Sequence, residues 1–343
     1  MSGAVAVADV VVLAAPAKVN LHLGIYPGHD GQGYHRADSL MVALDVADEV
    51  VVRRVAPGSG LSVRCEPPLD LVPEKNTAYR AAVALARAVE AAGVRGDAPG
   101  RGDAPSRGDA PGRGDAPSWG EAPGRGARAG QASTPDIEIL IRKRVPSQAG
   151  LGGASSDAAS VLMALGELWG IAADDPVLAE AARSVGADVA FFLDPVPTLL
   201  VGRGDVVAEK FEPLVEPVPV VLVRPAGEGV STPAAYRDFD KLHEGPGDPA
   251  GLCELLRAGR VTSARVAGLL SNNLDPVACR LQPTVRQVRD WLRAHELVLG
   301  AQVSGSGSCV FGICATSDDA QAVAREATAC FGPDTWARVT SFR

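Results

Sequence analysis

The chain has 343 residues, enough for about two domains that each bury their own core. Its hydrophobic share of 46% comes from aliphatic rather than aromatic residues, as is typical of a folded globular protein. The net charge of −8 excludes a surface-wide basic field for nucleic acid or anionic lipid, so any phosphate site has to be local.

The N-terminal segment, residues 1–20, is apolar but has no positively charged start, and Lys18 and Asn20 follow closely. We interpret it as a first strand and not as a signal peptide. No apolar run reaches the roughly 18 residues that a membrane span needs. We therefore expect a cytoplasmic protein with no membrane contact and no nucleic-acid partner, and its six scattered cysteines to be reduced.

Residues 95–130 form six hexads of the type RGDAPG and contain almost no large apolar side chains. Such a segment cannot offset the entropy of ordering, which predicts a disordered insert in a loop. Its four RGD triplets suggest an adhesion function as one alternative, although the hexad repeat alone produces them. Deletion of the insert discriminates, because an enzyme would keep its activity and an interaction protein would lose its function.

Helical and strand periodicities alternate around this insert. Residues 76–93 have helical spacing, and residues 136–145 alternate as a half-buried strand that leads into a glycine-rich loop and a further helix. A helix at 175–185 ends before the sequence GADVAFFL. The remaining predicted elements are strands at 218–223 and 336–342, two strands within 298–314, one or two helices at 249–270, and helices at 282–295 and 317–329.

The glycine-rich loop, PSQAGLGGASS, joins a strand to a helix. Glycine permits close backbone approach, and the first turn of a helix offers unpaired N–H groups and a positive dipole end, so the loop predicts an anion site. The spacing matches neither a Walker loop nor a dinucleotide fingerprint, and a tight turn alone would also need glycine. The candidate phosphate-binding residues are Pro146, Ser147, Gln148, Ala149, Gly150, Leu151, Gly152, Gly153, Ala154, Ser155 and Ser156.

Three motifs in order, APAKVNLHLGI at 15–25, the glycine-rich loop, and VSGSGSCVFG at 303–312, resemble the signature of the GHMP kinases. The resemblance covers nearly the whole chain except the hexads and includes GYHRADSLM at 33–41 and GADVAFF at 186–192. It implies an α+β fold with a ribosomal-protein-S5-like ATP-binding lobe at 1–215 and a ferredoxin-like lobe at 216–343. It also implies an ATP-dependent phosphotransferase that phosphorylates the C2 hydroxyl of a cytidine-diphosphate-linked methylerythritol.

By the same resemblance, Asp188 is the catalytic base and Lys18 its electrostatic partner, which suits phosphoryl transfer. Taken alone, Lys18 could be an ordinary cation at a strand end, and Asp188 a residue in a turn after Gly186. Asn20 shares the side of the strand with Lys18 and is a predicted substrate residue. The cytosine is predicted to lie against Tyr34, His35 and Tyr236, although core packing is an alternative for Tyr236.

Magnesium is expected because the charge of a triphosphate must be offset, but no carboxylate can be assigned as its ligand. Ala154 replaces the third glycine of the usual loop, and Asn273 stands where relatives often have Asp. His22 and His29 are interpreted as packing or surface residues. A kinase for another small alcohol is the first alternative, and the chain is expected to be a monomer or weak homodimer.

Overall fold

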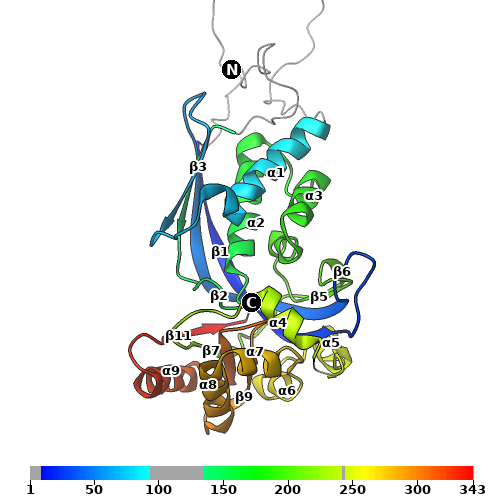
Figure 1. The fold of residues 1–343 in the computed structure, drawn as a ribbon, viewed down its shortest axis with the longest axis vertical. Coiled ribbons are helices and arrows are strands. Elements are labelled where there is room, and N and C mark those ends of the chain that lie inside the picture. Colours follow the sequence, from blue (N-terminus) through cyan, green and yellow to red (C-terminus); the bar gives the residue numbers. More distant parts are fainter. Residues whose placement is uncertain (1–8, 93–134, 242–243, 343) are drawn as a thin grey trace, which may run out of the picture.

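The computed structural model describes residues 9–92, 135–241 and 244–342. The predicted hexad insert at 95–130 lies outside these residues. In the described parts, a larger sheet with helices forms the N-terminal half, and a smaller sheet with helices forms the C-terminal half (Figure 1). The predicted α+β fold is confirmed. None of the helices in these parts is long and apolar enough to cross a membrane.

The larger sheet is organised around a long antiparallel pair of strands, β1 and β2. Its order is β3-β4-β2-β1-β8, while β5 pairs with β2 and β6 with β5. Strand β8 comes from the C-terminal half and pairs in parallel with β1. The strands are β1 (Val10–Ile25), β2 (Ala37–Arg54), β3 (Leu61–Glu66), β4 (Ile137–Arg142), β5 (Thr198–Val201), β6 (Val206–Lys210) and β8 (Ser271–Asn272).

Helix α2 (Gly153–Trp169) lies against β1 and β2, and helices α1 (Thr77–Ala92) and α3 (Pro176–Val185) pack beside it (Figure 1). The ends of α2 are set by glycines in the left-handed conformation, Gly152 before it and Gly170 after it. The described residues of this half also form three 3-10 helices: η1 (Pro73–Lys75), η2 (Ala187–Val189) and η3 (Phe191–Leu193).

The smaller sheet is antiparallel, with the order β11-β7-β10-β9. Its strands are β7 (Pro219–Arg224), β9 (Val298–Val303), β10 (Val310–Cys314) and β11 (Trp336–Ser341). The helices of this half are α4 (Thr232–Phe239), α5 (Ala250–Arg257), α6 (Ser263–Ala267), α7 (Asp275–Leu281), α8 (Pro283–Ala294) and α9 (Ser317–Phe331).

The buried apolar side chains form three clusters, and the second of them joins the two halves of the molecule. Leu21 of β1 and Leu44 of β2 belong to the same cluster as Leu222 of β7 and Phe311 of β10. Successive residues of β7 point to opposite faces, so Val221 belongs instead to the third cluster, beneath α8 and α9. The smaller sheet is therefore buried on both faces, one of them against the larger sheet.

The predicted helices and strands are present, with ends within a few residues of those expected from the periodicity. The stretch at 249–270, predicted as one or two helices, forms two, α5 and α6. Helices α4 and α7 and the 18-residue length of β2 were not predicted, because motif residues and prolines interrupt their apolar periodicity. All six cysteines are free, as expected, and only Cys330 is exposed.

Candidate active site

A cavity of about 540 Å³ lies between the two halves of the molecule and collects most of the predicted site residues. Lys18, Asn20 and Asp188 line it, together with Tyr236 from α4. The whole glycine-rich loop except Ser156 also lines it. Leu274, Gly305 and Ser306 close it from the C-terminal half. Residues predicted from three separate motifs therefore share one space.

The glycine-rich loop depends on backbone conformations that favour glycine. Gly150 and Gly152 have φ values of 76° and 70°, in the left-handed region. A Cβ on Gly150 would lie 2.0 Å from the carbonyl oxygen of Ser304, and one on Gly152 would lie 2.9 Å from Cγ of Lys18. A backbone carbonyl next to Gly150 and side chains next to Gly152 thus leave no room for a side chain at either position.

Backbone hydrogen bonds fasten this loop to both halves of the chain. The amide of Lys18 donates to the carbonyl of Leu151 at 2.9 Å, where the register between β1 and β2 shifts. In the SGSGS segment, the Ser304 hydroxyl donates to the carbonyl of Gly150 at 2.9 Å. Directly after this segment, the amide of Cys309 donates to the carbonyl of Ala149 at 3.0 Å. The first and third motifs therefore hold the second in place.

Lys18 is buried, at 4% exposure, in the floor of the cavity. Its Nζ donates to Asn20 Oδ1 at 2.7 Å, and Asn20 Nδ2 donates in turn to the Ser39 hydroxyl at 2.7 Å. The Lys18 Nζ lies 3.8 Å from Oδ2 of Asp188. Asp188 belongs to η2, the 3-10 helix that begins directly after Gly186. Burial lowers the pKa of Lys18, and the charge of Asp188 acts against that shift. A cation and a carboxylate therefore meet at the cavity wall.

A buried charge cluster beneath the loop was not predicted. Lys143, at the end of β4, donates to Asp48 of β2 at 2.5 Å and to Asp157 of α2 at 2.7 Å. Burial raises the pKa of Asp157 to about 7. Asp157 Oδ1 and Ser156 Oγ have no hydrogen-bond partner within the described residues. Two carboxylates thus share one lysine next to the predicted phosphate site.

The residues predicted to bind cytosine lie at the other end and are less enclosed. Tyr34 is 57% exposed, and the guanidinium of Arg203 lies over its ring at 4.5 Å. His35 is buried, and its ring centroid lies 5.8 Å from that of Tyr236. Tyr34 and His35 do not line the main cavity, whereas Tyr236 does. Arg203, which was not predicted, lines the cavity as well.

Tyr236 has two environments. It packs partly against the third apolar cluster, as its alternative interpretation expected, and it also lines the cavity. Burial and then the charge of Asp188 raise the pKa of Tyr236 to about 12. Its hydroxyl therefore stays protonated at neutral pH.

The two departures from the usual family motifs, Ala154 and Asn273, are compatible with the structure. Ala154 occurs inside α2, where no left-handed conformation is required. The side chain of Asn273 donates to the carbonyl of Ile25 at 2.8 Å and accepts from the amide of Ile25 at 2.9 Å. An aspartate could not make both bonds, because its carboxylate only accepts hydrogen bonds. Asn273 therefore clamps the end of β1. His22 is buried and hydrogen-bonded to Ser271 at 2.7 Å, which agrees with a packing role.

Comparison with known families finds two matching models. The family described as "GHMP kinases N terminal domain" matches residues 124–194, and the one described as "GHMP kinases C terminal" matches residues 250–333.

Individual proteins similar to this chain carry one recurring name. The 4-diphosphocytidyl-2-C-methyl-D-erythritol kinase of Desulfitobacterium hafniense (strain Y51) is 33% identical over 317 residues, covering 92% of this chain and 90% of that protein. The enzyme of the same name from Nocardia farcinica (strain IFM 10152) is also 33% identical, covering 92% of this chain and 89% of that protein.

Solved structures of kinases are also similar to this chain. A crystal structure of 4-(cytidine 5'-diphospho)-2C-methyl-D-erythritol kinase matches with a TM-score of 0.65 and 30% identity, over 96% of this chain and 99% of that one. Homoserine kinase from Cytophaga hutchinsonii matches with a TM-score of 0.65 but only 18% identity, over 97% of this chain and 95% of that one. The second likeness concerns the fold alone.

Proposed function

The chain belongs to the GHMP kinase family, and on that premise we propose that it transfers the γ-phosphate of ATP to the C2 hydroxyl of 4-diphosphocytidyl-2-C-methyl-D-erythritol. The products are ADP and the 2-phosphate, in the non-mevalonate synthesis of isoprenoid precursors. The observation that carries the proposal is the meeting of Lys18 and Asp188 with the glycine-rich loop in one cavity.

The glycine-rich loop, Pro146–Ser156, binds the ATP phosphates in this proposal. Support comes from the left-handed glycines and from the first turn of α2, whose N–H groups have no side-chain cap. Such N–H groups and the helix dipole attract a phosphate anion.

Asp188 acts as the general base and Lys18 compensates charge. As the substrate oxygen attacks the γ-phosphorus, Asp188 accepts the hydroxyl proton and the bond to the bridging oxygen of ADP breaks. Lys18 is held toward the reacting groups by Asn20, which accepts its hydrogen bond at 2.7 Å. The buried ammonium then faces the developing negative charge without the screening of bulk water.

Magnesium accompanies the ATP. The residues present fit such a hard cation, because oxygen donors of Ser155, Asp157 and Asp188 line the cavity, and Asp157 Oδ1 is buried without a partner among the described residues. Ser155 and Asp157 are the residues that would hold the ion. When bound, magnesium offsets the negative charge of the triphosphate.

The cytosine lies between aromatic faces at the far end of the cavity. Tyr236, which lines the cavity, and Tyr34, which lies outside its lining, provide flat surfaces for stacking, and the ring of His35 lies beside Tyr236 at a centroid distance of 5.8 Å. The ATP-binding lobe covers residues 1–215 and the second lobe residues 216–343 in this proposal. The enzyme acts in the cytoplasm, which the six free thiols support, as a monomer or weak homodimer.

Coupled measurement of ADP release from a panel of alcohols tests the proposed substrate. Turnover is expected with the cytidylylated methylerythritol and not with mevalonate, homoserine or galactose. Turnover of one of those three at a comparable kcat/KM would contradict the substrate while leaving the kinase chemistry intact. Deletion of residues 95–130 should leave this activity in place.

A further inference from the structure

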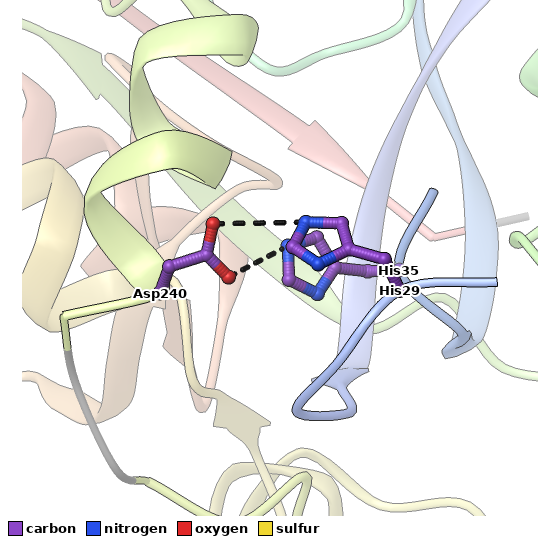
Figure 2. Close-up of side chains that lie close together, drawn as sticks. All are labelled: His29, His35 and Asp240. Carbon is purple, nitrogen blue, oxygen red and sulfur yellow. Dashed lines mark ion pairs between the residues drawn. The ribbon is translucent and has the colours of Figure 1, made fainter. Parts of the chain in front are cut away.

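Three side chains of the types that bind metal ions, two histidines and an aspartate, lie close together outside the main cavity (Figure 2). His29 and His35 come from the loop between β1 and β2, and Asp240 directly follows α4. The two oxygens of Asp240 each face one imidazole, at 3.7 Å from Nε2 of His29 and 3.2 Å from Nε2 of His35. All three donor atoms lie within 4.8 Å of one another.

The hydrogen bonding of His35 leaves a lone pair directed at this group. Its Nδ1 lies 3.1 Å from the carbonyl oxygen of Tyr26, which can only accept, so Nδ1 carries the proton. In the neutral ring, Nε2 is then an acceptor that faces a carboxylate oxygen of Asp240. This Nε2 is buried and has no hydrogen-bond partner among the residues that the structure describes. A proton on Nε2 or a metal ion would each satisfy this pair, and a metal ion would engage His29 as well.

We propose that His29, His35 and Asp240 bind a divalent transition-metal ion, of which Zn²⁺ is the best fit. Two imidazole nitrogens and one carboxylate suit zinc, whereas magnesium prefers oxygen donors alone. Oδ1 of Asp240 lies 3.2 Å from Nε2 of His35, and Oδ2 lies 3.7 Å from Nε2 of His29. Each separation is close to the distance of about 3.4 Å between donors that bonds of about 2.1 Å give in a tetrahedral site.

The surroundings of the group also suit a metal ion. The bond from Nδ1 of His35 to a backbone carbonyl is the outer contact that orients metal-bound histidines. The side chains of His29 and Asp240 are 44% and 41% exposed, so an ion can enter from solvent and a water molecule can take the fourth position. A bound ion would fasten the β1–β2 loop to the end of α4.

Zinc binding to the full-length chain, freed of any affinity tag, tests the site directly. We would titrate Zn²⁺ against a chromophoric chelator and record the visible spectrum with Co²⁺, which reports coordination geometry. The wild type is expected to bind one ion with a four-coordinate cobalt spectrum. His29→Ala and Asp240→Asn are each expected to weaken zinc binding by about tenfold or more, because each removes one of three ligands.

His295→Ala is the matched control, because His295 also pairs with a carboxylate, Glu326, at 3.1 Å but belongs to no group of three such side chains among the described residues. It should bind zinc as the wild type does. His35 is left unchanged because it is also assigned to the cytosine, so its substitution would not separate the two roles.

Three results would overturn the site: no zinc binding by the wild type at micromolar concentration, equal affinity in all variants, or loss only in the control. Thermal unfolding provides a second measurement that separates lost ligands from lost folding. Zinc should raise the Tm of the wild type and the control but not that of the folded His29→Ala and Asp240→Asn chains.

Discussion

The two ends of the cavity are constructed differently. At the phosphate end, the loop is held by backbone hydrogen bonds from β1 and from the SGSGS segment, and Lys18 beneath it is buried. At the base end, side chains from the β1–β2 loop and α4 approach each other, and Tyr34 is 57% exposed. The phosphate end therefore has little room for substitution, whereas the base end presents replaceable side-chain surfaces.

Removal of the proposed base at the phosphate end should have the largest effect. Asp188→Asn keeps the size of the side chain but cannot accept the hydroxyl proton, so kcat is expected to fall by about 10²–10⁴. The affinity for ATP, measured by calorimetry, should change little. Asp194→Asn, which alters an exposed carboxylate paired with Lys210, is the control. An unchanged kcat in Asp188→Asn would remove this residue from the mechanism.

A single added methyl group tests how tightly the phosphate end is packed. Gly150→Ala places Cβ 2.0 Å from the carbonyl oxygen of Ser304 at a φ of 76°. We expect a loss of more than about 2 kcal/mol in the free energy of unfolding, with much weaker ATP binding.

Gly58→Ala separates the two causes, because Gly58 has a φ of 86° and no atom within 4 Å of an added Cβ. It should show only the conformational cost, about 1 kcal/mol. Urea denaturation of both chains gives the difference, and equal losses would contradict the close packing of the loop.

Loss of a flat surface at the base end should give a smaller and more selective effect. Tyr236→Leu retains apolar volume but removes the ring, so the KM for the cytidine substrate is expected to rise about 5- to 100-fold, with kcat and the KM for ATP little changed. Tyr236→Phe retains the ring and should resemble the wild type. If Tyr236→Leu and Tyr236→Phe show the same steady-state kinetics, Tyr236 contributes only to packing.

The charge cluster beneath the loop predicts the smallest effect, on stability against pH. Because the pKa of Asp157 is raised to about 7, the folded chain retains a proton that the unfolded chain releases near pH 4. Raising the pH between these values therefore lowers stability. Asp157→Asn should remove that decline, so that its free energy of unfolding relative to wild type improves by about 1–3 kcal/mol from pH 5 to pH 8.

Urea denaturation without added magnesium, at four pH values, measures this change. Asp70→Asn, at an exposed site, should follow the wild type throughout. Parallel curves for wild type and Asp157→Asn would contradict the raised pKa.

The parts predicted best from the sequence are those in which neighbouring residues determine the structure. Strand, glycine turn and helix follow each other directly at 136–169, and the shared side of Lys18 and Asn20 follows from strand periodicity. Asp188 could be placed near Lys18 only through the family resemblance, because no local pattern relates residues so distant in the chain.

Long-range contacts explain what was missed. Lys143 gave no signal because its partner Asp48 lies 95 positions earlier in the chain. His29 was interpreted as a packing or surface residue, since its neighbour Asp240 directly follows a helix that periodicity did not predict. Such side chains are brought together by tertiary packing of separate elements, for which a single sequence carries no spacing rule.

The apolar cluster shared by the two sheets has a mechanical consequence. A hinge rotation that opened the cleft would separate Leu21 and Leu44 from Leu222 and Phe311 and expose them to water. We therefore expect the two halves to move as one body during turnover. We expect ligand entry and product release to depend instead on small exposed segments such as the β1–β2 loop that carries Tyr34.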